Sequence, residues 1–157
     1  MRSQLAAGLN VTFVSDHDST KNHKAIKAYS DRRGVPFIPS IEISPSWGHF
    51  NVFPIDVGAQ LSVDPGVDDI HNIIKDARRM GATVVASNHP YISYGYLSSL
   101  EKNTATGGFN PSIDLIELNS EVDYKKAIEK ARQLWSEGLP YYYTAGSDTH
   151  DVWNETS

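Results

Sequence analysis

Several strand-like runs in this chain end on residues that titrate or bind metal, and this pattern constrains the fold more than any other feature. Residues 11–14 read Val-Thr-Phe-Val, a β-branched and aromatic run that is typical of a buried strand. After one serine come Asp16, His17 and Asp18. A segment of this kind has a hydrophobic anchor at one end and reactive side chains at the other.

The pattern recurs in three further segments. Each is a strand-like run followed by a histidine or a carboxylate: residues 35–41 before Glu42, residues 83–88 before His89, and residues 141–147 before Asp148 and His150. In a parallel sheet the carboxyl ends of the strands meet on one face, where α/β folds build their active sites. We therefore expect these side chains to converge in one cleft.

Helical patterns alternate with the strand-like runs. They cover residues 2–8, residues 21–33 after a cap at Ser19 or Thr20, residues 67–80 and residues 121–137, and glycines at 8, 34, 81 and 138 end them. The second of these helices is expected to bury Ala25, Ile26 and Tyr29. Further strands are expected at 52–57 and 113–118, and the long loop at 91–111 is typical of a functional or mobile segment. The alternation predicts an α/β fold with a mainly parallel sheet.

Composition narrows the function classes. A length of 157 residues predicts a single domain over 1–157. The net charge is −5 and the chain has no cluster of Lys and Arg, so we do not expect it to bind nucleic acid. No apolar run is long enough to predict a membrane span. No targeting segment is recognisable, so a cytoplasmic location is expected. The expected partner is a small-molecule substrate. The sequence does not indicate the oligomeric state.

The candidate ligands are His, Asp and Glu, because the chain has no cysteine. This donor set suits Zn²⁺, Mn²⁺ or Fe²⁺ bound for catalysis better than a closed structural zinc site. Asp148 and His150 are two residues apart, so an extended backbone presents both on one side. Glu42 and His49 flank a loop that contains proline and glycine, and both can reach one ion.

Each motif taken alone also has a structural interpretation. A lone histidine is more often a hydrogen-bonded structural group than a ligand. Asp16 or Asp18 could cap the helix that follows. The proline after His89 favours an extended backbone there, which would aim the ring. The recurrence of polar residues at several strand ends nevertheless favours a metal site.

The ordered set of motifs resembles the PHP superfamily (polymerase and histidinol phosphatase). The motifs are Ser15-Asp16-His17-Asp18, Ser40-Ile41-Glu42-Ile43, Gly48-His49-Phe50-Asn51, Asn88-His89-Pro90, Ile116-Glu117-Leu118-Asn119 and Gly146-Ser147-Asp148-Thr149-His150. The Gly-His-x-Asn element resembles the CehA/McbA-like branch. The resemblance implies a distorted, TIM-like β/α barrel with a metal centre of two or three ions at the carboxyl ends of the strands. Most characterised members hydrolyse phosphoesters, and some relatives cleave other bonds, such as carbamate esters.

The resemblance also implies roles for individual residues. The residues that match family metal ligands are His17, Glu42, His49, His89, Asp148 and His150. Glu42 would bridge two ions, one completed by His49 and His89 and the other held by His17 and His150, and Asp148 would help to hold a third. Asp16 would orient the ligands around it. In a hydrolase, His150 or His17 would protonate the leaving oxygen. Asn119 either lines the pocket or belongs to a strand end.

One part of the family pattern is absent. The family opens with a strand that carries His-x-His, followed by an Asp in a Ser-Asp-Gly context, and neither occurs here. His23 and His71 lie in predicted helices, where surface or packing roles are expected. The sequence therefore predicts a partial barrel that lacks its first β/α unit and holds one to three ions.

Three functions remain open at this point. The first is hydrolysis of a small phosphoester, the second is hydrolysis of a carboxylic ester or carbamate, and the third is metal binding without catalysis. Aromatic residues would form the walls of the pocket or take part in ordinary packing: Trp47, Phe50, Tyr91, Tyr94 and Tyr96.

Overall fold

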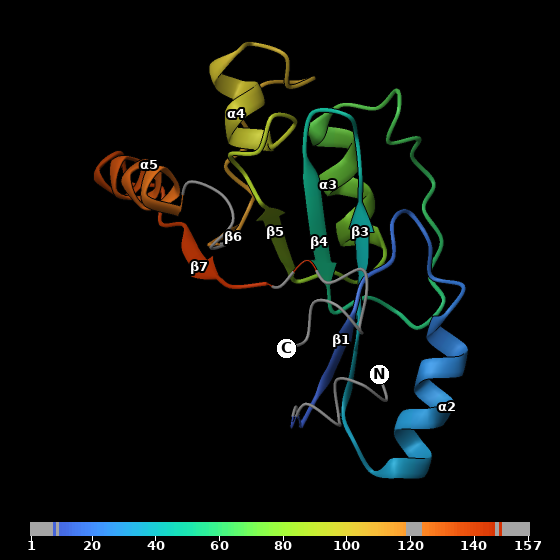
Figure 1. The fold of residues 1–157 in the computed structure, drawn as a ribbon. Coiled ribbons are helices and arrows are strands. Elements are labelled where there is room, and N and C mark those ends of the chain that lie inside the picture. Colours follow the sequence, from blue (N-terminus) through green and yellow to red (C-terminus); the bar gives the residue numbers. More distant parts are fainter. Residues whose placement is uncertain (1–7, 9, 119–123, 147, 149–157) are drawn as a thin grey trace.

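Short strands alternate with helices in the computed structural model, which describes residues 8, 10–118, 124–146 and 148 (Figure 1). The elements are β1 (Thr12–Val14), α2 (His23–Arg33), β2 (Phe37–Pro39), β3 (Ile41–Ile43), β4 (His49–Phe53), α3 (Ile70–Arg79), β5 (Val84–Asn88), α4 (Tyr96–Glu101), β6 (Leu115–Glu117), α5 (Tyr124–Ser136) and β7 (Tyr142–Thr144). Residues 2–7 of the first expected helix lie outside the described residues. The predicted α/β class is confirmed.

The sheet is mixed, whereas a mainly parallel sheet was expected. Five strands pair in the order β3-β4-β5-β6-β7, with β4 antiparallel to both of its neighbours and the remaining pairs parallel. The reason is the short connection at 44–48, which joins β3 to β4 as a hairpin and so forces an antiparallel pair. β1 pairs in parallel with β2.

The segment after β1 continues alongside β3. The backbone N–H of Glu42 donates to the carbonyl of Asp16 at 3.1 Å, and that of Asp18 donates to the carbonyl of Glu42 at 2.9 Å. The chain from β1 to Asp18 therefore follows β2 and then β3. Within the described ranges β1 and β7 do not pair, so a TIM-like barrel remains a prediction.

The hydrophobic core lies between the centre of the sheet and α3, which covers one face of β3 and β4 (Figure 1). Ile70 and Ile73 of α3 are fully buried, as are Phe50 and Val52 of β4. Because side chains alternate along a strand, His49, Asn51 and Phe53 project from the other face of β4. The core thus fixes which side of β4 presents polar groups.

Helix α2 buries polar residues, which differs from the expected face. Its N-cap is Asn22, not Ser19 or Thr20, and Ala25 is exposed, whereas His23 and Ser30 are buried. Nδ1 of His23 accepts from the Gly58 N–H at 3.2 Å, so its Nε2 carries the proton and donates to the Ser40 carbonyl at 2.8 Å. His23 therefore has the packing role expected for it.

Local signals located the helix ends well. Gly34, Gly81 and Gly138 adopt positive φ after their helices, where glycine is favoured. Val67 was expected in α3 but lies before it and is 77% exposed, because the helix starts after Asp69, whose side chain accepts from Asn72 N. The expected loop at 91–111 contains α4. In the described part of the chain, no helix is long and apolar enough to cross a bilayer.

Candidate metal centre

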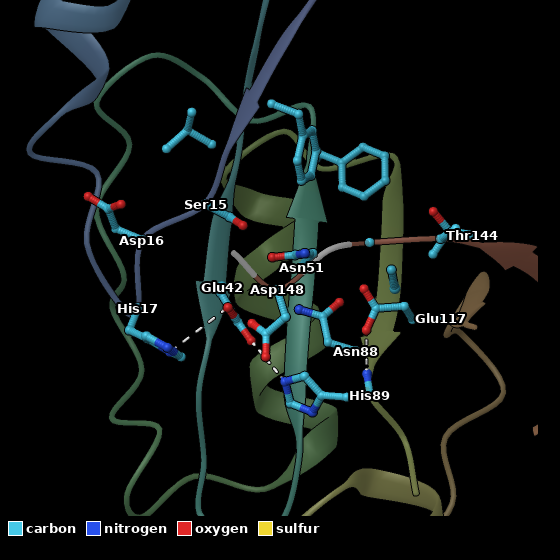
Figure 2. A pocket seen from close by; sticks show the side chains of 16 residues that line it. Ser15, Asp16, His17, Glu42, Asn51, Asn88, His89, Glu117, Thr144 and Asp148 are labelled. Atoms are coloured by element: carbon cyan, nitrogen blue, oxygen red, sulfur yellow. Dashed lines mark hydrogen bonds and ion pairs between the residues drawn. The ribbon is translucent and has the colours of Figure 1, made fainter. Parts of the chain in front are cut away.

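One cavity of about 710 Å³ lies over the face of the sheet from which Asn51 and Phe53 project, and it extends from β1 to the segment after β7 (Figure 2). The lining residues are Phe13, Val14, Ser15, Asp16, His17, Glu42, Asn51, Phe53, Ala86, Asn88, His89, Glu117, Thr144, Ala145, Gly146 and Asp148. Every described strand except β2 therefore contributes at least one residue to the cavity wall.

Glu42 is the hub of the polar end of this cavity. It lies in the middle of β3, not after the end of a strand as expected, and the alternation along β3 turns it away from the core. Three imidazoles surround its carboxylate: Nδ1 of His49 at 3.0 Å, Nε2 of His89 at 3.6 Å and Nδ1 of His17 at 4.0 Å. Side chains far apart in the sequence thus meet at one carboxylate.

The electrostatic environment keeps Glu42 ionised. Burial opposes ionisation, but the His49 and His89 rings and the Asn88 amide outweigh it, so the pKa of Glu42 lies well below its ordinary value. Burial in turn lowers the pKa of His89, yet Glu42 and the carboxylates of Asp148 and Glu117 raise it above the ordinary value overall. The arrangement therefore favours an anionic carboxylate among basic nitrogen atoms.

Several polar atoms of this cluster are buried without hydrogen bonds. Glu42 Oε1, His49 Nδ1 and His89 Nδ1 make none with the residues that the structure describes, although the first two atoms are only 3.0 Å apart. Buried polar atoms normally have partners, and a bound cation would satisfy such a group. Ligand atoms of His17, Glu42 and His49 all lie within 4.8 Å of one another, close enough to hold one ion.

The charge of the cavity points the same way. Its wall contains four carboxylate residues, Asp16, Glu42, Glu117 and Asp148, and none of the described lining residues is lysine or arginine. Two imidazoles and one carboxylate with space beside them form a donor set typical of catalytic zinc, and the same donors suit Mn²⁺ or Fe²⁺. The residues present therefore fit a divalent cation.

His89 has an unusual backbone conformation. Its φ is +25°, which contradicts the extended backbone expected before Pro90. The backbone N–H of His89 donates to Oε2 of Glu117 at 2.6 Å, and this bond outweighs the local preference. Burial raises the pKa of Glu117, a 5% exposed carboxylate whose neighbour Gly146 leaves no room for a side chain. Sequence reasoning included Glu117 only in a strand-end motif with Asn119 and gave it no role of its own.

Asp16 contacts the helix that follows it. Its Oδ2 accepts from Asn22 Nδ2 at 2.7 Å, and Figure 2 shows its side chain directed away from Glu42. Its link to the centre is the backbone bond from Glu42. The catalytic role expected of Asp16 remains a prediction.

Within the described residues, the compact group of candidate ligands contains His17 with Glu42 and His49. The expected pairing of His17 with His150 stays a prediction. Asp148 lines the cavity and has φ of +51°. His150 and Asn119 lie outside the described residues, so their expected roles remain predictions.

The aromatic residues divide into two groups. Trp47, Phe50 and Tyr96 are buried and pack against one another, so packing is their role. Tyr94 is 46% exposed, and its ring lies 5.2 Å from the His49 ring and 5.9 Å from the His89 ring. Tyr94 therefore borders the centre. Tyr91 contacts Glu101 and Lys126.

Comparison with known proteins gives a partial similarity. No family model matches the chain. A segment of 78 residues, 47% of the chain, is 33% identical to part of a 3',5'-nucleoside bisphosphate phosphatase from Chromobacterium violaceum. That segment spans 27% of the length of this relative. The similarity supports a relationship to a phosphatase, which agrees with the reaction class that the motifs predict.

Proposed function

We propose that the chain is a PHP-type hydrolase that uses divalent metal ions to hydrolyse a small phosphoester. The proposal rests chiefly on the pocket around Glu42, where three imidazoles surround one buried carboxylate. The similarity to a phosphatase supports the same reaction class.

Electrostatics connects the pocket to this substrate. An acidic cavity repels a phosphoester anion unless cations neutralise its wall. In the proposed enzyme His17, Glu42 and His49 hold one ion, and His89 and Asp148 provide ligands from the same cavity. A bound divalent ion supplies charge neutralisation at a phosphoryl oxygen and lowers the pKa of a coordinated water.

The protein groups then have distinct tasks. Glu42 stays anionic and is held in place on both sides by the backbone bonds to Asp16 and Asp18. The amides of Asn51 and Asn88 face the cavity, where they can donate to substrate oxygens (Figure 2). His150 protonates the leaving oxygen as a general acid in this proposal.

The test is an assay with an aryl phosphate in the presence of Mn²⁺ or Zn²⁺. We expect chelator to abolish hydrolysis and Glu42→Gln to reduce it by at least about 100-fold, since the hub of the ligand set loses its charge. Glu129→Gln, at an exposed site on α5, is the matched control and should retain full activity. The proposal would be contradicted if the wild type hydrolysed the substrate equally fast with and without chelator and Glu42→Gln were as active as the wild type.

Two other outcomes would identify the alternative functions. Chelator-sensitive cleavage of an aryl carbamate or carboxylic ester, without phosphoester hydrolysis, would retain the metal centre and change the substrate class. Tight metal binding without any hydrolysis would indicate a non-catalytic metal-binding domain.

A further inference from the structure

Ser44 connects three groups of the candidate centre, although it does not line the cavity. Its Oγ lies 2.6 Å from Nδ1 of His17 and donates to the carbonyl of Glu42 at 3.1 Å. Its backbone N–H donates to Oδ1 of Asp18 at 2.9 Å. Ser44 follows the last residue of β3, between the buried residues Ile43 and Pro45, so its position is fixed by the core.

The hydrogen bonds of Ser44 favour one tautomer of His17. A serine hydroxyl has one hydrogen, and when it is directed to the Glu42 carbonyl, Oγ accepts at the 2.6 Å contact with Nδ1 of His17. In a neutral ring this places the proton on Nδ1 and leaves on Nε2 the lone pair that a metal ion requires.

The His17 side chain is more exposed than the other two imidazoles. Its side chain is 45% exposed, against 16% for His49 and 4% for His89. It comes from the turn after β1, where Asp18 adopts a φ of +50°. Burial therefore restrains the His17 ring less than it restrains the rings of His49 and His89.

We propose that Ser44 is a positioning residue that holds the His17 ring in its Nδ1–H tautomer and so selects Nε2 as the metal-binding nitrogen. Its effect on metal binding rests on the function proposed above. The tautomer is a property of the metal-free chain and is tested separately.

The first experiment records two-bond ¹H–¹⁵N spectra of the chelator-treated protein at about pH 8.5, above the ordinary titration range of histidine. His17→Gln identifies the His17 signals by their loss. We expect a protonated Nδ1 and an unprotonated Nε2 in the wild type, and a mixture of tautomers in Ser44→Ala. A protonated Nε2 in the wild type would overturn the proposal, whatever the variants do.

The second experiment measures Zn²⁺ and Mn²⁺ affinity by calorimetry. Ser44→Ala removes the hydroxyl but keeps the backbone bond to Asp18, and we expect it to weaken binding about 10- to 100-fold. Ser44→Thr keeps a hydroxyl and should bind nearly as tightly as the wild type. Ser46→Ala, at an exposed serine two residues away, is the matched control.

The two experiments distinguish failure of the positioning role of Ser44 from failure of the metal site. Wild-type affinity in a folded Ser44→Ala protein would overturn the positioning role. A wild type that binds no divalent ion but shows the Nδ1–H tautomer would overturn the proposed function and support the Ser44 contact.

Discussion

The centre of the molecule, strands β3 to β5, holds its residues more firmly than the two ends, which are the separate two-stranded sheet β1–β2 and the edge strand β7. In the centre, β3 is buried throughout, β4 pairs with β5 over five residues, and α3 covers the face behind them. At one end β1 pairs over three residues with β2, whose residues are all half-buried. At the other end β7 exposes Tyr142 and Tyr143.

This difference divides the candidate ligands. Glu42, His49 and His89 come from the centre or directly follow it, and their positions are fixed by register and burial. His17 and Asp148 come from the segments after β1 and β7. The central ligands are therefore preorganised by the core, whereas His17 depends on a specific contact with Ser44.

Truncation of core and edge side chains should show the largest contrast. Phe50→Ala removes a fully buried ring from the aromatic cluster with Trp47 and Tyr96 and should lower the free energy of unfolding by about 3–5 kcal/mol. Tyr143→Ala removes a 44% exposed ring from β7 and should cost less than about 1 kcal/mol. Urea denaturation measures both, and equal losses would contradict the contrast.

Acid should lower the free energy of unfolding through Asp76 of α3, by less than Phe50→Ala does. Burial opposes ionisation of Asp76, but Arg79 and Ser62 bind its carboxylate and lower its pKa from 3.8 to about 2. A lowered pKa stabilises the fold above the unfolded value of 3.8 and loses that contribution as pH falls toward 2. Because Arg79 is half exposed, we expect about 1 kcal/mol after solvent screening.

Asp76→Asn tests this contribution. The variant should be less stable than the wild type at neutral pH, and the difference should narrow as pH falls from about 5 to 2. Urea midpoints across this range measure it. A difference that stays constant with pH would show that the carboxylate charge is not the cause.

Sequence reasoning located the elements whose signals are local. The glycine stops at 34, 81 and 138 and the amphipathic pattern of α3 depend on neighbouring residues, so they could be read directly. The hairpin between β3 and β4 was missed, because β4 begins at His49 among polar residues, whereas the strand was expected to begin at residue 52. Glu42 likewise lies within a strand where a strand end was expected.

The candidate site was predicted as a set of residues but not as a geometry. The motifs gave His17, Glu42, His49, His89 and Asp148, all of which lie in or beside one cavity region. The bonds of Ser44 to His17 and of Glu117 to His89 join residues 27 and 28 positions apart, and their geometry follows from strand register. The positive φ of His89 likewise follows from a tertiary bond that opposes its local preference.

Calorimetric titration of the metal-free protein with Zn²⁺, compared with Glu42→Gln, Asp148→Asn and Glu129→Gln, tests whether this cavity is a metal centre built on Glu42. We expect the tightest ion to disappear in Glu42→Gln, because the carboxylate shared by three imidazoles loses its charge. Asp148→Asn should keep this ion with weaker affinity, and Glu129→Gln should match the wild type. Retention of the tightest ion with unchanged affinity in Glu42→Gln would contradict the assignment.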